Sequence, residues 1–291
     1  MATKSGTRKT VFITGATDGL GRASALLLAE RGYRVFAAGR SAEKRVGLDA
    51  VAREKNLPLE TLELDVCSDA SVQRAVAAVI EKAGAPDVLF NNAGVNFSAV
   101  VEDLRIEDWR RQFETNFFGV LRVTKALLPH MRERRGGRIV MMSSVSGFVT
   151  APTQGAYSGS KFALEALSNA LRLELYPFNI RVVLIEPGYI ITGIQQAAAE
   201  LAKPYMEKMQ SGAYAALYER FLASVTGARA RSGTTPEDCA RVVLRAIESP
   251  NPRIRYVVTR LGVFAKWAKR FLPDKALDAM FRRRFGIVRG E

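Results

Sequence analysis

Hydrophobic and polar positions along the chain follow two alternating patterns. Short, nearly continuous apolar runs such as residues 35–38 have strand length, whereas segments such as residues 69–82 carry apolar side chains at helical spacing. Repeated alternation of the two patterns predicts a parallel sheet with helices on both faces. Seven strands are expected, at residues 10–14, 34–38, 59–64, 87–90, 138–142, 180–185 and 255–259.

The segments between these strands predict the helices. They are expected at residues 20–30, 43–55, 69–82, 106–134 and 157–176, with the long helix 106–134 broken near Pro129. Residues 188–232 are irregular and prone to form helix, and they are too many for a simple connection. We therefore expect an α/β fold in one domain over residues 1–291, with a substrate lid at 188–232.

Composition narrows the class of protein. With 291 residues, 48% hydrophobic and 25% charged, the chain is typical of a globular protein, which excludes disorder, collagen and small disulfide scaffolds. Its apolar runs are far shorter than the roughly 18 residues of a membrane span, and the polar start lacks the apolar core of a signal peptide. The two cysteines, Cys67 and Cys239, indicate a reducing compartment, so a cytoplasmic location is expected.

Metal chemistry and histidine-dependent catalysis are not expected. Neither cysteine has a second cysteine or a histidine at the spacing of metal ligands. His130 is the only histidine, so one chain cannot form a Ser-His-Asp triad or a multi-histidine metal site.

Charge is concentrated at the C-terminus. The whole chain carries 43 basic and 29 acidic residues, and residues 251–291 hold eleven basic against three acidic residues, interleaved with aromatic ones. We expect a basic amphipathic helical extension at 260–291, with peripheral contact to a membrane as one function and a cap on the substrate cleft as another. The alternative is a packed tail with a solvated basic face. Without a recognised binding module, nucleic acid is not an expected partner.

A glycine-rich turn joins the first strand to the first helix. The strand 10–14 runs directly into Thr14-Gly15-Ala16-Thr17-Asp18-Gly19-Leu20-Gly21. Glycines let the backbone approach a pyrophosphate, and a helix N-terminus favours the anion. The candidate cofactor-binding residues here are Gly15, Thr17, Asp18, Gly19, Leu20 and Gly21. The alternative is a glycine turn without a ligand.

The end of the second strand indicates which dinucleotide binds. Folds of this kind usually place an acidic residue there, on the ribose 2′-hydroxyl, but this chain has Gly39-Arg40. A guanidinium can hold a 2′-phosphate through bidentate hydrogen bonds, so NADP(H) is expected in preference to NAD(H). The alternative is that Arg40 is a plain surface residue.

Tyr157 and Lys161 lie four residues apart, so they project from one face of the predicted helix. A positive charge near a phenol favours the phenolate, and Lys161 is therefore expected to lower the pKa of Tyr157 and fit it for acid-base catalysis. Ser144 follows the strand 138–142, where its hydroxyl can hydrogen-bond a substrate carbonyl or hydroxyl. The pair alone is common on helix surfaces, and only the combination with Ser144 and the glycine turn is informative.

These motifs together resemble the short-chain dehydrogenase/reductase family, and the steroid and retinol dehydrogenase branches within it. The resemblance covers roughly residues 10–192 and implies a Rossmann fold with a doubly wound seven-stranded parallel sheet. It adds further elements in the family's order, at Asp65, Asn91-Asn92-Ala93-Gly94, Asn116, Pro187-Gly188 and Thr192.

The resemblance also implies roles for these residues. Asp65 and Val66 would contact the adenine, and the turn with Asn92, Ala93 and Gly94 would brace the sheet beside the cofactor. Lys161 would also bond the nicotinamide ribose, and Asn116 would hold a water in a proton relay with it. Around the nicotinamide and its phosphates, the implied residues are Pro187, Gly188, Ile190 and Thr192. Structural alternatives are a helix cap for Asp65, a backbone-bonded amide for Asn116 and a plain turn for Pro187-Gly188.

The expected function is interconversion of a carbonyl and an alcohol, with Ser144 and Tyr157 stabilising the oxyanion. The lid suits a steroid, retinoid, fatty or similar lipophilic substrate, unless its apolar side chains only pack the lid helices. These side chains are Tyr189, Ile191, Ile194, Tyr205, Met206, Met209, Tyr214, Leu217, Tyr218 and Phe221. By resemblance, two helices pair between subunits in a homodimer or homotetramer. The alternatives are a cofactor-binding regulator or scaffold without turnover and an NAD(P)-dependent epimerase or dehydratase.

Overall fold

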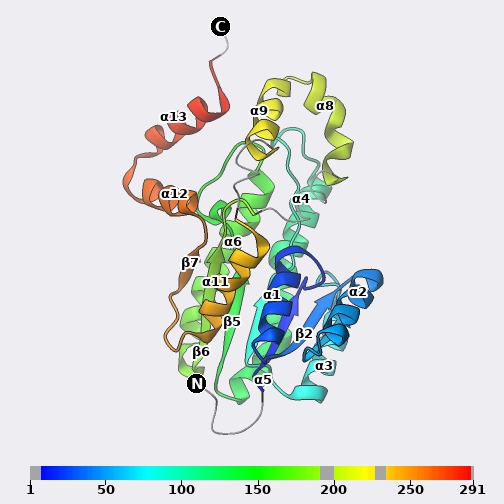
Figure 1. Cartoon of the computed structure of the whole chain (residues 1–291). Coiled ribbons are helices and arrows are strands. Elements are labelled where there is room, and N and C mark those ends of the chain that lie inside the picture. Colours follow the sequence, from blue (N-terminus) through cyan, green and yellow to red (C-terminus); the bar gives the residue numbers. More distant parts are fainter. Residues whose placement is uncertain (1–7, 191–199, 227–233, 290–291) are drawn as a thin grey trace.

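The computed structural model describes residues 8–190, 200–226 and 234–289, and within them seven parallel strands form one sheet (Figure 1). The strands follow the order β3-β2-β1-β4-β5-β6-β7, which confirms the predicted doubly wound sheet. Their order reverses between β1 and β4, where folds of this kind have a binding crevice at the carboxyl edge. The bounds are β1 Thr10–Thr14, β2 Arg34–Gly39, β3 Leu59–Glu63, β4 Val88–Asn91, β5 Gly137–Met142, β6 Ile180–Glu186 and β7 Arg255–Val257.

Alternate residues of each strand enter two separate cores, because side chains of a strand point to opposite faces. Phe12 and Leu89 are paired in register and pack with α3, α5 and α6, while Ile13 and Phe90 pack on the other face with α1 and α11. Both faces are covered, so β1 is buried along its whole length. The helices are α1 Gly19–Glu30, α2 Ala42–Glu54, α3 Asp69–Ala83, α5 Gly119–Glu133, α6 Gly155–Glu174 and α11 Pro236–Glu248.

The helix predicted at 106–134 is interrupted, but the predicted place of the break was wrong. α4 (Ile106–Phe113) passes into a π-helical turn, Glu114–Phe118, and α5 then continues through Pro129. Pro129 lies on the exposed side of α5, where water can bond the carbonyl that it leaves unpaired. The π-helical turn contains Asn116, whose amide bonds the backbone of Val95, and such turns are frequent at functional sites.

One helix was missed in the sequence. α11 begins after Thr235, whose hydroxyl accepts a hydrogen bond from the backbone N–H of Asp238 while the Asp238 carboxylate accepts one from the N–H of Thr235. This capping box, followed by Pro236 at the first helical turn, is a recognisable start signal. The apolar side of α11 packs against α1 in the core.

The expected lid region contains two helices above the carboxyl edge of the sheet, α8 (Met206–Ser211) and α9 (Ala215–Thr226) (Figure 1). Tyr205 and Tyr218 are buried in a third cluster with Phe97 and Leu104. The Tyr218 hydroxyl donates to Asp103 at 2.9 Å. These two tyrosines therefore pack the lid helices, which was the alternative to lining a substrate pocket. The same holds for Met209 and Leu217, which contact the same cluster. Ile191 and Ile194 lie outside the described residues.

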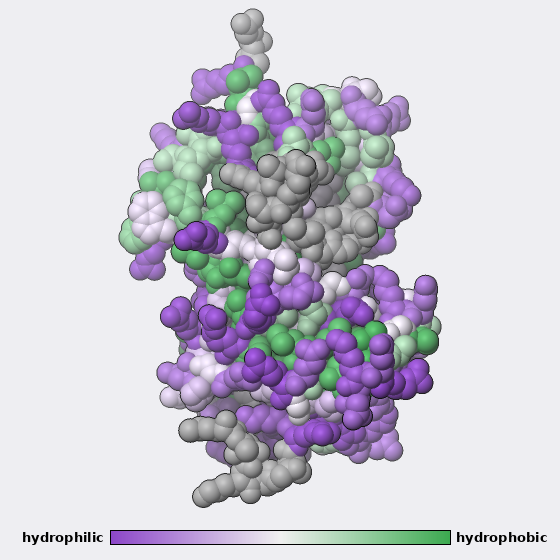
Figure 2. Space-filling view, in the orientation of Figure 1, coloured by the Kyte–Doolittle hydropathy of each residue, from purple (hydrophilic) through white to green (hydrophobic). Residues whose placement is uncertain are grey.

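The C-terminal part forms α12 (Arg260–Phe271) and α13 (Asp274–Phe285), which lie beside the sheet near its carboxyl edge (Figure 1). Thr259 caps α12 by accepting from the N–H of Gly262 at 3.0 Å. The outer surface of this hairpin carries pale and green side chains between purple ones (Figure 2). Within the described residues, every helix is too short or too polar to cross a bilayer.

Candidate active site

Three predicted catalytic side chains come together beyond the carboxyl end of β5. Ser144 follows the strand by two residues, and its hydroxyl donates to the carbonyl of Pro187 at 3.4 Å and accepts from the N–H of Ser146 at 3.1 Å. Tyr157 and Lys161 lie in the first turns of α6, with Nζ of Lys161 5.6 Å from the centroid of the Tyr157 ring. The structure therefore brings the serine, the phenol and the amine to one edge of the sheet.

Burial governs the ionisation of the phenol and the amine. It raises the pKa of Tyr157, and the Ser144 hydroxyl beside the phenol opposes this shift. Burial also lowers the pKa of Lys161 to about 8, while the negative charge of Glu165 opposes it. The net direction at Tyr157 is thus opposite to the expected lowering, because desolvation outweighs the neighbouring groups.

Lys161 is also anchored to the sheet. Its Nζ donates to the carbonyl oxygen of Met142 at 2.7 Å, which joins α6 to the end of β5. An ammonium has three donors, so Lys161 keeps donors for a ribose hydroxyl or a water.

Asn116 is buried and already engaged by protein groups. Its Oδ1 accepts from the N–H of Val95 at 2.9 Å, and its Nδ2 donates to the carbonyl of Val95 at 3.0 Å and to the hydroxyl of Ser160 at 3.2 Å. Ser160 in turn donates to the carbonyl of Tyr157 at 2.7 Å. These contacts fit the alternative of a backbone-bonded amide, and they connect the π-helical turn to the start of the catalytic helix.

The glycine turn has the shape of a dinucleotide cradle. Gly15 has φ +63°, and a Cβ there would lie 2.8 Å from Cα of Ala93, while a Cβ on Gly21 would overlap the carbonyl oxygen of Gly15. The turn therefore packs directly on the neighbouring loop, so only glycine fits at these two positions. Asp18 caps α1 by accepting from the N–H of Gly19 at 2.7 Å. Thr17 and Leu20 are half-buried in the same turn.

Basic side chains border the end of β2. Arg40 is exposed, and no carboxylate in the described ranges forms an ion pair with it. Lys44, one turn into α2, forms an ion pair with Asp18, which lowers the pKa of that carboxyl. Arg45 donates to the carbonyls of Gly39 and Arg40 at 2.9 and 2.8 Å and so fixes this loop. Arg45 was not among the predicted residues, although its position about one helical turn beyond Arg40 indicates that it lies near the same loop.

The loops after β3 and β4 serve mainly to hold the cradle. Asp65 accepts from the N–H of Cys67 at 2.9 Å, and the Val66 side chain is buried in the core. Asn92 donates to the carbonyls of Thr14 and Gly15 at 3.1 and 2.9 Å, so it ties the glycine turn to the loop after β4. Ala93 and Gly94 continue this loop, and the N–H of Ala93 donates to the Thr14 hydroxyl at 3.1 Å.

The segment after β6 closes the site from the other side. The Pro187 carbonyl accepts from Ser144 and from the N–H of Val145 at 2.9 Å. A Cβ on Gly188 would overlap the hydroxyl of Thr259, so this turn packs on the start of the C-terminal hairpin. Ile190 is buried, and the predicted residue Thr192 lies outside the described residues.

Sequence reasoning missed a buried charged network behind the site. Glu186, the last residue of β6, is 1% exposed and forms ion pairs with Arg255 at 3.2 Å and Lys266 at 2.6 Å. Arg255 also pairs with Glu165 at 3.0 Å, and Ser143 donates to the other oxygen of Glu165 at 2.6 Å. Glu186 and Ser143 directly precede Pro187 and Ser144, and Glu165 lies on α6 with Tyr157 and Lys161. The charge and spacing of these residues gave no signal, because they meet only through the sheet order.

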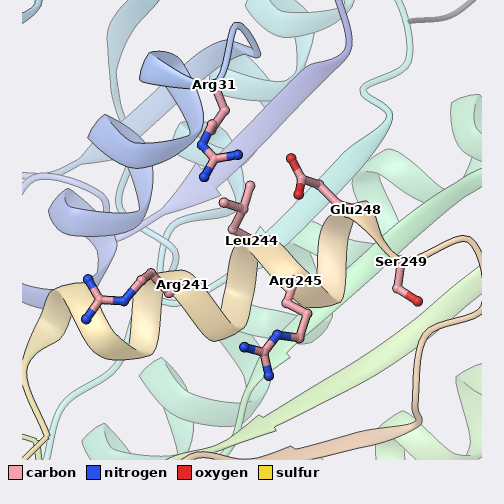
Figure 3. A pocket seen from close by; sticks show the side chains of 6 residues that line it. All are labelled: Arg31, Arg241, Leu244, Arg245, Glu248 and Ser249. Carbon is pink, nitrogen blue, oxygen red and sulfur yellow. The ribbon is translucent and has the colours of Figure 1, made fainter. Parts of the chain in front are cut away.

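A separate surface hollow lies away from these residues. It has a volume of about 410 Å³ and lies between the end of α1 and the second half of α11 (Figure 3). Arg31 points from α1 toward Glu248, and Arg245 and Arg241 project from α11 (Figure 3). α1 starts at the carboxyl edge of the sheet, so its end and this hollow lie toward the opposite edge from Ser144 and the glycine turn.

The residues at the carboxyl edge fit a nicotinamide dinucleotide. The glycine cradle, the N-terminus of α1 and exposed Arg40 suit its phosphates, and the half-buried phenol and buried amine suit proton transfer at its reactive end. In the described part of the chain, His, Cys, Asp and Glu side chains form no cluster of three that can hold a metal ion.

Comparisons with known proteins agree with this arrangement. A family model described as short chain dehydrogenase matches residues 9–202. The chain is 35% identical over 281 residues to 3-ketodihydrosphingosine reductase of Bacteroides thetaiotaomicron, covering 95% of this chain and 98% of the relative. It is 34% identical over 277 residues to retinol dehydrogenase 8 of Bos taurus, covering 94% and 85%. A crystal structure of an actinorhodin polyketide ketoreductase variant with NADPH has a TM-score of 0.74 and 31% identity, covering 89% and 97%.

Proposed function

The chain belongs to the short-chain dehydrogenase/reductase family of oxidoreductases, and from this membership we propose that it interconverts a carbonyl and an alcohol on a lipophilic substrate with NADP(H). The observation that carries the proposal is the meeting of Ser144, Tyr157 and Lys161 beside the glycine cradle. A regulator or scaffold has no physical need for a buried amine next to a half-buried phenol, since a charged amine is expensive to desolvate.

Each side chain has a separate task in the proposed reaction. The bound nicotinamide supplies or accepts the hydride at the substrate carbon. The hydroxyls of Ser144 and Tyr157 hydrogen-bond the substrate oxygen and stabilise its negative charge. In the reductive direction Tyr157 donates its proton to that oxygen, and in the oxidative direction it removes one. Lys161, held by the Met142 carbonyl, stabilises the resulting phenolate by its charge and renews the proton.

The proposed preference for NADP(H) rests on Arg40. Its guanidinium is exposed beyond β2, where the adenosine ribose of a bound dinucleotide would lie, and a carboxylate for the 2′-hydroxyl is missing from Gly39-Arg40. Support also comes from the actinorhodin ketoreductase structure, which contains NADPH. Arg40→Ala is expected to lower the ratio of NADPH to NADH efficiency at least tenfold. Arg53→Ala is the control and should leave the ratio unchanged, because Arg53 is exposed in the last turn of α2, at the far end of that helix from Arg40. An unchanged ratio in Arg40→Ala would contradict the assignment.

The lipophilic substrate class is supported by two observations. The relatives described above are named for 3-ketodihydrosphingosine and retinol, both of which are largely hydrocarbon. In this chain Tyr189, Met206 and Tyr214 remain exposed next to or within the proposed lid at 188–232, whereas Tyr205 and Tyr218 are buried. Exposed apolar side chains near the substrate region favour an apolar ligand.

The reaction is tested by following the loss of NADPH absorbance with a panel of lipophilic ketones and aldehydes. Tyr157→Phe is expected to abolish turnover while NADPH still binds, because only the transferable proton is removed. Tyr176→Phe is the matched control, since Tyr176 is exposed and follows the same helix. Full turnover by Tyr157→Phe would refute the mechanism. Binding of NADPH without turnover of any compound would favour the regulator, and turnover without net redox change would favour an epimerase or dehydratase.

Assembly and location complete the proposal. Phe118, Phe162 and Leu173 are exposed large apolar side chains on or next to α5 and α6, and burying them between subunits would form a homodimer or homotetramer. Measurement of the solution mass tests this, and a monomeric mass at micromolar concentration would contradict it. A cytoplasmic location stays a prediction from cysteine content.

A further inference from the structure

The first helix of the C-terminal hairpin has an exposed aromatic stripe. Phe264, Trp267 and Phe271 lie at i, i+3 and i+7 and are 47%, 52% and 61% exposed. Their rings contact one another along the helix, with centroids 6.3 Å apart for the first pair and 5.5 Å for the second. Leu261 and Val263 extend the exposed apolar surface at the start of α12. Such a contiguous surface is unusual in water and marks a contact site.

Basic side chains surround this stripe. Residues 260–289 hold nine basic and two acidic side chains. Lys269 and Arg270 flank the aromatic residues on α12, and Arg282, Arg283 and Arg284 are exposed on the last turn of α13. Of the two acidic residues, Asp274 is paired with Lys269 at 2.9 Å. Apolar anchors with a strong positive charge around them are typical of helices that lie in the interface of an anionic bilayer.

The opposite face of α12 is fixed to the body of the protein. Gly262 packs against Val145 and Val257, where a Cβ would lie 2.8 Å from side-chain carbons of both. Lys266 pairs with the buried Glu186 at 2.6 Å, and its ammonium lies 5.2 Å from the centre of the Phe148 ring. Because this inner face is held by a buried charge and a close glycine contact, the exposed aromatic stripe lies on the outer face of the helix.

We propose that α12 and α13 form a docking surface for anionic lipid bilayers, with the aromatic stripe in the interface and the arginines on the lipid phosphates. A second copy of this chain fits less well, since it would bring two strongly basic surfaces together. Thr259, the residue that caps α12, packs against Gly188 in the turn after β6. Docking through α12 therefore places the carboxyl edge of the sheet, with its catalytic residues, close to the membrane surface.

The full chain is tested by sedimentation with vesicles of phosphatidylcholine alone and of phosphatidylcholine with about 30% phosphatidylserine, at about 0.1 and 0.5 M salt. We expect at least tenfold stronger binding to the anionic vesicles at low salt and a severalfold loss at high salt. The triple variant Arg282→Gln, Arg283→Gln, Arg284→Gln is expected to lose at least tenfold in affinity. Its matched control is Arg31→Gln, Arg241→Gln, Arg245→Gln, which removes equal charge from the hollow of Figure 3.

Tryptophan emission provides an independent readout. The chain has two tryptophans, and Trp109 is packed against an interior cluster, so Trp267 is the one whose environment changes on docking. A blue shift with anionic vesicles is expected in the wild type and not in Trp267→Phe, which keeps the apolar surface and still sediments. A Phe264→Ser, Phe271→Ser variant is expected to bind at least tenfold more weakly while keeping its NADPH affinity.

Four outcomes would overturn the proposal. They are equal binding to neutral and anionic vesicles, absence of binding to both, equal losses in the two arginine variants, and vesicle-independent association of the chain that Phe264→Ser, Phe271→Ser abolishes. The last outcome would assign the surface to a second copy. The readouts are binding and emission, so they do not depend on the proposed redox activity.

Discussion

Removing the ammonium of Lys266 leaves the buried carboxylate of Glu186 with one cation in place of two. Lys266→Met keeps an unbranched side chain of similar length and removes the ammonium, which also lies 5.2 Å from the centre of the Phe148 ring. Glu186 is 1% exposed, whereas Lys266 is 39% exposed and loses little hydration in the pair. Across 2.6 Å at an effective dielectric constant of about 20, the attraction has an upper bound of about 6 kcal/mol. Because Arg255 remains 3.2 Å from the carboxylate, we expect a loss of about 2–3 kcal/mol.

The loss should depend on pH in a defined direction. Burial raises the pKa of Glu186 above its ordinary value of 4.5, and Lys266 opposes this shift. The variant therefore has a still higher folded-state pKa than the wild type. An acid whose pKa is raised by folding destabilises the protein above that pKa, and protonation relieves this as the pH falls. The difference in unfolding free energy between wild type and Lys266→Met should be largest near pH 8 and smallest near pH 5.

Urea unfolding at several pH values and one protein concentration measures this difference. With a slope of about 3 kcal/mol/M, the midpoint of Lys266→Met should fall by about 0.7–1 M near pH 8. The double variant Lys266→Met, Glu186→Gln should recover part of the loss, because the uncompensated charge is gone. Lys269→Met is the control, since its exposed pair with Asp274 contributes about 0–1 kcal/mol. Equal losses at both pH values, or a double variant no more stable than the single one, would refute the reasoning.

Three further predictions concern the site and its support. The pKa of Lys161, about 8, predicts that kcat/KM falls at high pH; Glu165→Gln removes a negative charge that raises this pKa, so the fall should move to lower pH, and an unmoved profile would contradict this. Tyr218→Phe should lower the unfolding free energy by about 1–3 kcal/mol, because a buried backbone N–H loses its acceptor, whereas the exposed Tyr214→Phe should have almost no effect in the same urea assay. Gly21→Ala should reduce NADPH affinity at least tenfold in a fluorescence titration, and retained affinity would show that the cradle tolerates a Cβ.

The local sequence pattern was sufficient to predict the strands of the sheet and to identify the residues of the glycine turn. Apolar runs of strand length can be read directly from the chain, and Gly15 and Gly21 stand where any tight strand-to-helix turn needs them. The break in the helix after Ile106 was placed at Pro129 because proline is a known helix breaker. The observed interruption is the π-helical turn that contains Asn116, whose amide bonds a backbone segment that the sequence gives no reason to place there.

Only part of the candidate site could be predicted from the sequence, for a similar reason. Ser144, Tyr157 and Lys161 have a recognisable spacing, but the direction of the Tyr157 pKa depends on burial, which spacing does not reveal. The pairs that join Glu186 to Arg255 and Lys266 link residues about 70–80 positions apart, and only the strand order brings them together. Long-range pairs of this kind have no local signature.

The order of the strands also determines when each part of the sheet can form while the chain is being synthesised. β1 is made first, yet its neighbour β4 follows about 75 residues later, and the last strand of the sheet comes near residue 255. A chain still on the ribosome therefore holds the dinucleotide cradle before it has the means to bury Glu186. In this interval the edge of β6 lacks β7 and Glu186 lacks the lysine of α12, so we expect the growing chain to be most prone to aggregation then.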